Sequence, residues 1–71
     1  MSIITDPSTT LAIAELRSAR ASLNGARAEV RRAHDRLYGA HRVRAGEALR
    51  RVGEALRWTE KTLTELEEET P

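Results

Sequence analysis

Alanine and larger aliphatic residues alternate at steps of four and three along the first half of the chain, with mostly polar residues between them. This spacing is a heptad repeat, which gathers the apolar residues into one row along an α-helix. Alanine fills every second position, so no large side chain there holds a neighbouring helix away. The row comprises Ala12, Leu16, Ala19, Leu23, Ala26, Val30, Ala33, Leu37 and Ala40.

The first helix is predicted to run from Pro7 to Tyr38. Asp6 is placed to cap its first turn, and proline suits the first helical position because that position needs no N–H donor. Gly39 stands where a left-handed C-cap residue is expected, and the arginines of the last turns favour the negative end of the helix dipole.

Beyond Ala40 the apolar residues no longer follow the heptad positions of the first row, and a second apolar row begins. A phase break beside a glycine predicts an all-α fold, an antiparallel helical hairpin with helices over residues 7–38 and 42–69. Residues 7–69 then form one domain, with residues 1–6 as a lead-in and residues 70–71 as a tail. The alternative is one continuous helix in a long coiled coil, with the break absorbed as a stutter. The second row is Ala45, Leu49, Val52, Leu56, Thr59, Leu63 and Leu66.

The second helix contains a direct repeat, Arg44-Ala-Gly-Glu-Ala-Leu-Arg50 followed by Arg51-Val-Gly-Glu-Ala-Leu-Arg57. Its two glycines, Gly46 and Gly53, lie beside the apolar row, and each costs about 1 kcal/mol relative to alanine inside a helix. Two such glycines seven residues apart indicate that the backbone of this helix approaches a neighbour closely, either the alanine row or a neighbouring subunit. The alternative is that small residues simply occupy an exposed face.

Composition predicts self-association. The 71 residues allow one domain, and they include fourteen leucines, isoleucines and valines, eleven alanines and no phenylalanine. A single core in a chain this short seldom supplies more than about 3–5 kcal/mol, and the absence of cysteine excludes disulfides. A two-helix hairpin has only one inward face, so we expect a homo-oligomeric helix bundle. The expected interface residues are Ala12, Leu16, Ala19, Leu23, Ala26, Val30, Ala33, Leu37, Leu49, Val52, Leu56, Trp58 and Leu63.

No constellation for catalysis is found in the sequence. His34 and Asp35 are adjacent, so they are expected to point to different sides of a helix. His34 and His41 are seven residues apart, not at the spacing with which two helical histidines share a metal. We therefore expect no catalytic residues, no metal and no cofactor, and two histidines beside a solvated turn.

Charge is distributed unevenly along the chain, although its net value is only +1. Residues 27–57 carry nine arginines against four acidic residues, whereas residues 58–71 carry one lysine against five glutamates. A hairpin would fold the basic section about its turn and leave the acidic section at the open end. The acidic tail opposes the helix dipole, so we expect it to fray and to favour solubility.

The basic turn is the candidate site for an anion. Arg42 and Arg44 are expected in the first turn of the second helix, where free N–H groups favour an anion. An arginine guanidinium group can bind two phosphate oxygens at once, and Tyr38 offers a flat surface on which a base could stack. The alternative is a solvated charged face with intrahelical pairs such as Glu47–Arg51 and Glu54–Arg57. The candidate ligand-binding residues are Arg32, Arg36, Tyr38, His41, Arg42 and Arg44.

Residues 54–63 resemble the closing helix of the hairpin domain in small phage anti-defence proteins, which sequester the cyclic-nucleotide signals of bacterial CBASS and Thoeris immunity. In that family a Glu-Ala pair precedes a tryptophan, followed by a basic and then an aliphatic residue. The matching residues are Glu54, Ala55, Trp58, Lys61 and Leu63. The resemblance implies an oligomeric sponge without catalysis, with a phosphate-lined pocket between subunits.

Three functions follow as hypotheses. The first is a non-catalytic oligomeric protein that captures a small phosphorylated anion, preferably a cyclic nucleotide, at the turn. The second is a protein–protein interaction module that docks a host or structural partner. The third is a nucleic-acid-binding hairpin dimer, whose affinity would fall steeply with salt. No apolar run is long enough for a membrane span, so we expect no membrane partner and a cytoplasmic protein, in the host cytoplasm if phage-encoded.

Overall fold

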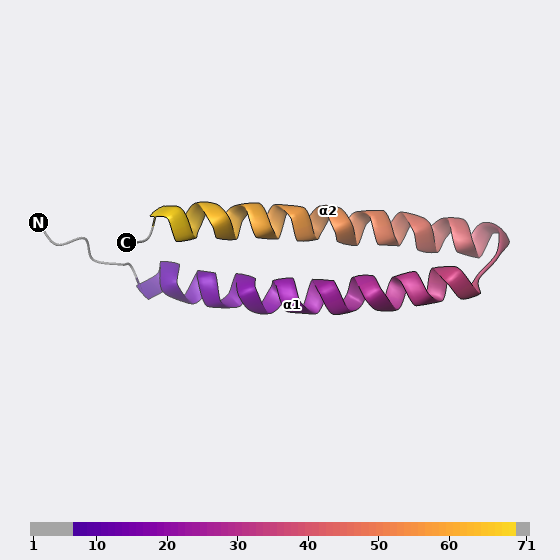
Figure 1. Cartoon of the computed structure of the whole chain (residues 1–71), viewed down its shortest axis with the longest axis horizontal. Coiled ribbons are helices and arrows are strands. Elements are labelled where there is room, and N and C mark those ends of the chain that lie inside the picture. Colours follow the sequence, from indigo (N-terminus) through magenta and orange to yellow (C-terminus); the bar gives the residue numbers. More distant parts are fainter. Residues whose placement is uncertain (1–6, 70–71) are drawn as a thin grey trace, which may run out of the picture.

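Two long helices lie side by side and antiparallel in the computed structural model, which describes residues 7–69 (Figure 1). Helix α1 spans Pro7–Arg36 and helix α2 spans Gly39–Glu69, which confirms the predicted hairpin and excludes the continuous helix. With 30 and 31 residues, the helices are nearly equal in length, each about 46 Å at a rise of 1.5 Å per residue. The cap at Asp6, the lead-in 1–6 and the tail 70–71 lie outside the described residues.

The connection between the helices is tighter than predicted. Helix α1 ends at Arg36, and the Leu37 N–H donates to the His34 carbonyl at 3.2 Å. Gly39 has φ of +63°, the left-handed conformation that glycine adopts without the steric cost met by other residues, as the sequence predicts. This residue is already the first of α2 and not a separate cap.

The earlier start of α2 corrects the prediction for the first helical turn. The Arg42 N–H donates to the Tyr38 carbonyl at 3.4 Å, so it already belongs to the helical hydrogen-bond ladder. The N–H groups without an intrahelical acceptor are those before it, at residues 39–41. Arg42 and Arg44 therefore do not supply free backbone N–H groups to an anion, and only their side chains are available as donors.

The two apolar rows pack against each other along the hairpin. Leu56 and Leu63 are buried, with exposed fractions of 3% and 1%, and the rest of the second row is half-buried. The first row is half-buried from Ala12 to Val30 and at Leu37, whereas Ala33 and Ala40 are exposed. The predicted rows are confirmed except at these two alanines, which lie near the turn.

Among residues 7–69, Ile13 is the remaining buried hydrophobic residue, with 8% of its surface exposed. It was absent from the predicted row because it directly follows Ala12, one position off the strict heptad. The apolar stripe of a packed helix is often wider than two positions per heptad, and a flanking position then contributes to the core. Ile13 fills such a position near the open end of the hairpin.

One ion pair joins the helices, between Arg17 of α1 and Glu67 of α2. Both side chains are about half exposed, with side-chain exposed fractions of 57% and 42%. Solvent-exposed pairs of this kind contribute between about 0 and 1 kcal/mol. Apolar packing, not this ion pair, therefore provides most of the attraction between α1 and α2.

Truncation of the most buried side chain tests this conclusion. Leu63→Ala is expected to lower the free energy of unfolding by about 2–5 kcal/mol, because it removes buried methyl groups and leaves a cavity. Urea denaturation followed by far-UV circular dichroism measures the change. Thr64→Ala, on the exposed side of the same turn, is the control and should change stability by less than about 0.5 kcal/mol. Equal stability of both variants would show that this row does not hold the hairpin together.

Candidate functional site

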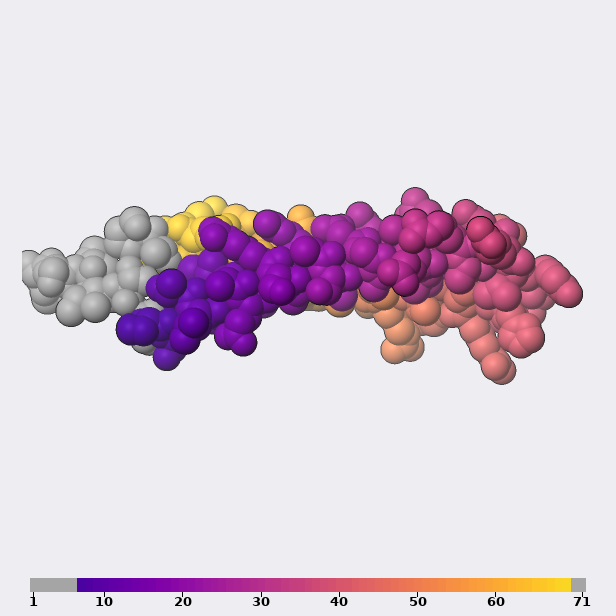
Figure 2. Space-filling model, turned by 90° about the horizontal axis from the view of Figure 1, so that it is seen from below, coloured from indigo at the N-terminus to yellow at the C-terminus, as the bar shows by residue number. Residues whose placement is uncertain are grey.

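The hairpin brings the six predicted ligand-binding residues to one end of the molecule. Arg32 and Arg36 lie in the last turns of α1, Tyr38 in the connection, and His41, Arg42 and Arg44 in the first turns of α2. All six are exposed, and Tyr38 most of all at 85%. In Figure 2, side chains from the part of α2 near the turn (pink to salmon) stand out from the body of the rod. These six residues are called the turn-end cluster below.

The side chains of the turn-end cluster are free of internal partners. Within residues 7–69, none of them takes part in a side-chain hydrogen bond, an ion pair or a cation–π contact. The nearby acidic side chain of Asp35 contacts His34 instead, with its Oδ1 atom 3.4 Å from Nδ1. Four guanidinium groups at one end of the hairpin therefore keep their donors available.

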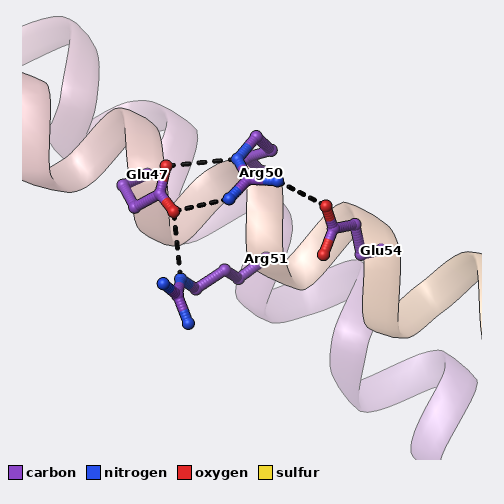
Figure 3. Close-up of polar contacts among 4 residues, drawn as sticks. All are labelled: Glu47, Arg50, Arg51 and Glu54. Atoms are coloured by element: carbon purple, nitrogen blue, oxygen red, sulfur yellow. Dashed lines mark hydrogen bonds and ion pairs between the residues drawn. The ribbon is translucent and has the colours of Figure 1, made fainter.

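The arginines in the middle of α2 are arranged differently, as Figure 3 shows. Arg50 donates to both carboxylate oxygens of Glu47, at 3.1 and 2.6 Å, and to Glu54 at 2.5 Å. Arg51 donates to Glu47 at 3.1 Å, which confirms the predicted Glu47–Arg51 pair. Glu54 pairs with Arg50 and not with Arg57 as predicted, so Arg57 is left without an acidic partner among the described residues.

Hydrogen bonds in this network shift the pKa values of its members. Donation from Arg50 and then from Arg51 lowers the pKa of Glu47 to about 2, and the same contact raises the pKa of Arg50. The carboxylate therefore stays ionised below pH 4.5, where an ordinary glutamate becomes protonated, and holds both guanidinium groups. Two of the basic charges counted in the sequence are compensated within the helix.

A groove opens between the helices beside Gly53. It has a volume of about 650 Å³, and a β-carbon at Gly53 would meet no atom within 4 Å, so the space beside this residue is open. The direct repeat in the sequence singled out Gly53, but the sequence did not indicate that Gly53 lies beside arginines of both helices. The residues lining the groove are Arg27, Arg50, Gly53, Glu54, Leu56, Arg57 and Glu60.

The glycine of the first repeat unit faces a different neighbour. A β-carbon at Gly46 would lie 3.6 Å from both Cδ2 and Nε2 of His34, an ordinary van der Waals distance to a side chain. The predicted close approach of Gly46 and Gly53 to the backbone of the alanine row is therefore wrong within the hairpin. Their approach to a neighbouring subunit stays a prediction.

The two histidines differ in their surroundings, because His34 is half-buried and contacts Asp35 whereas His41 is exposed. The ring of His34 contacts Asp35, so the prediction that these two side chains point apart is wrong, although 3.4 Å is long for a hydrogen bond. No group of three or more histidine, aspartate or glutamate side chains capable of holding a metal occurs among residues 7–69.

Neither helix of this part of the chain is long and apolar enough to cross a membrane.

Trp58 lies on the outside of the hairpin with 63% of its surface exposed. Lys61, one turn later, places its Nζ atom 5.0 Å from the centroid of the indole ring, within the range of a cation–π interaction. Trp58 is thus not part of the packing between α1 and α2. Its predicted place at a subunit interface, and the alternative of stacking on a ligand, both stay predictions.

Comparison of the chain with protein-family models, with curated proteins and with solved structures found no match in any of the three. The resemblance of residues 54–63 to the phage anti-defence family therefore stays a prediction.

The Glu47 network gives a pH-dependent prediction. The folded pKa of about 2 lies below the ordinary value of 4.5, so the network stabilises the helix fully above about pH 4.5. This stabilisation is lost as the pH falls from there through about 2. An NMR titration of the Glu47 carboxyl carbon should show a midpoint near 2, and Arg50→Gln should raise that midpoint toward 4.5. A wild-type midpoint already at 4.5 would contradict the network.

Proposed function

We propose that the hairpin is the subunit of a non-catalytic homo-oligomer that captures a small phosphorylated anion at the turn-end cluster. The observation that carries this proposal is the contrast between two groups of arginines. Arg50 and Arg51 in mid-helix are bound by glutamates, whereas Arg32, Arg36, Arg42 and Arg44 at the turn have no partner among the described residues. Basic side chains left free together at one end favour an anionic ligand.

The chemistry of the turn-end cluster suits phosphate. A guanidinium group binds two phosphate oxygens at once through parallel N–H donors, and such charge-assisted hydrogen bonds are stronger than neutral ones. Tyr38 stands exposed between the two basic helix ends and offers an aromatic face on which a base can stack. A cyclic nucleotide, which the family resemblance implies, combines phosphates with such bases.

Self-association is proposed from the small extent of the core. Three side chains are buried among the described residues, whereas Leu11, Val43 and Trp58 are each more than 60% exposed. Further burial of apolar surface is available only through contact with another chain, at roughly 25 cal/mol for each Å² removed from water. Trp58 is the largest of these exposed side chains, and tryptophan is enriched among the residues that dominate binding energy at interfaces.

A second candidate function is a protein–protein interaction module without a small-molecule ligand. The observation that favours it is the complementary charge of the two ends of the rod. Glutamates at positions 65, 67, 68 and 69 lie at the open end of α2, opposite the basic turn. An acidic surface of a partner, including the open end of another copy, offers the turn-end cluster the same kind of acceptor as a phosphate does.

Calorimetric titration tests the ligand proposal. Cyclic dinucleotides, cyclic trinucleotides and cyclic ADP-ribose isomers are the probes, and saturable heat is expected with at least one of them. Arg36→Gln/Arg42→Gln should weaken that binding by at least tenfold, since each charge-assisted hydrogen bond is worth about 1.5–3 kcal/mol. Arg17→Gln/Arg20→Gln removes the same charge from the other half of α1 and should leave the affinity unchanged.

The titration also separates the competing functions. Absence of heat from every probe would contradict the ligand proposal and leave the interaction module. Equal weakening by both double variants would show that only the total charge matters. Binding of DNA that falls steeply with salt, with no response to the cyclic nucleotides, would instead favour the nucleic-acid hypothesis.

Measurement of molar mass tests the assembly. Light scattering and native mass spectrometry are expected to give at least twice the 7.9 kDa of one chain. Trp58→Ala should raise the dissociation constant of the assembly by at least about tenfold, because it removes a large apolar contact. Tyr38→Ala removes another exposed aromatic side chain outside the predicted interface and should leave the mass unchanged. A monomeric mass with cooperative unfolding would contradict self-association.

A further inference from the structure

The groove beside Gly53 is open to solvent and is lined by exposed charged side chains of both helices. Its volume of about 650 Å³ lies within the range of about 300–1,000 Å³ typical of small-molecule sites. Leu56, buried to 3% exposure, contributes an apolar side chain, while polar side chains of both helices complete the lining. Position 53 has no side chain to occupy the groove, although glycine is a poor residue for the interior of a helix.

The polar groups of the groove fall into two classes. Arg50 and Glu54 are bound to each other, so they form part of the wall and need no ligand. Arg57 has no hydrogen bond or ion pair within residues 7–69, and Arg27 has a single contact, to the Asn24 Oδ1 atom at 3.2 Å. Two guanidinium groups, one from each helix, therefore line the groove without an acidic partner.

Glu60 adds an acceptor to these two donors. Its backbone oxygen accepts from the Thr64 hydroxyl at 2.9 Å, but its carboxylate is bound to no other described residue. A ligand that satisfies all three groups must combine an anionic group for Arg27 and Arg57 with a neutral hydrogen-bond donor for Glu60. A bare anion would meet the arginines but would be repelled by the carboxylate.

We propose that the Gly53 groove binds a nucleoside monophosphate, with the phosphate held by Arg27 and Arg57 and a ribose hydroxyl or base amino group donating to Glu60. This site is separate from the turn-end cluster. Gly53 lies fourteen residues after Gly39, which is about 21 Å along the helix at 1.5 Å per residue. The proposal therefore does not depend on capture of a cyclic nucleotide at the turn.

NMR titration of the isotope-labelled protein with AMP tests the groove directly. The amide signal of Gly53 reports on the groove and that of Gly39 on the turn, so the two sites are read separately in one experiment. AMP is expected to shift the Gly53 signal saturably. Inorganic phosphate, which lacks the donor, and adenosine, which lacks the phosphate, should each bind at least about tenfold more weakly.

Gly53→Leu is the decisive variant, because its side chain would fill the groove while leucine raises helix propensity. We expect it to abolish AMP binding at the groove and to leave the melting temperature equal or higher. Gly25→Leu is the matched control. Gly25 is also a helical glycine with no atom within 4 Å of a β-carbon position, but it does not line the groove. This control should bind AMP as the wild type does.

Charge variants test the role of each group. Arg27→Gln/Arg57→Gln should weaken AMP by at least about tenfold. Glu60→Gln should weaken AMP but strengthen inorganic phosphate, since it replaces the charged acceptor by a weaker neutral one and removes the repulsion of the anion. A shift of Gly39 without one at Gly53, unchanged affinity in Gly53→Leu, or equal affinity for phosphate and AMP would each overturn the proposal.

Discussion

The contact between two apolar rows is the interaction on which the rest of the hairpin depends. Leu56 and Leu63 of α2 are buried in it, and Ile13 of α1 extends it toward the open end. Because a pair of helices has one shared face, the remaining surface of each helix must be polar, small or covered by another chain. The free arginines and the exposed Trp58 lie on that remaining surface, and the groove opens at its edge beside Leu56, so the narrow core determines which side chains are left to bind a ligand or partner.

The fold could be predicted from the sequence to a large extent, because heptad spacing and a glycine are local signals. Gly39 adopts the left-handed conformation expected of it, and the second row packs as its spacing indicates. The predicted start of α2 was wrong, because the first residue of a helix after a tight turn depends on which backbone carbonyl accepts the first helical hydrogen bond. Here that acceptor is the Tyr38 carbonyl. Ile13 was missed because strict heptad counting omits the positions that flank the row.

The candidate sites were predictable to a smaller extent. The hairpin topology alone brings the turn-end cluster together. Which arginines form ion pairs is harder to predict, because a glutamate with arginines three and four residues away on the same helix can pair with either. Glu54 has basic residues both four before it and three after it, and it binds Arg50 in preference to Arg57. The groove required knowledge of which α1 side chain lies opposite Gly53, and no pattern within one helix contains that information.

Gly39 has a consequence for chain exchange. The two helices are nearly equal in length, and their rows share one heptad period. A chain with a straightened connection could therefore satisfy the same contacts by exchanging α2 with a second copy, giving a domain-swapped dimer of long continuous helices. The left-handed backbone at Gly39 and the two non-helical residues before it reverse the chain, so they favour packing of α2 on its own α1 over exchange between molecules.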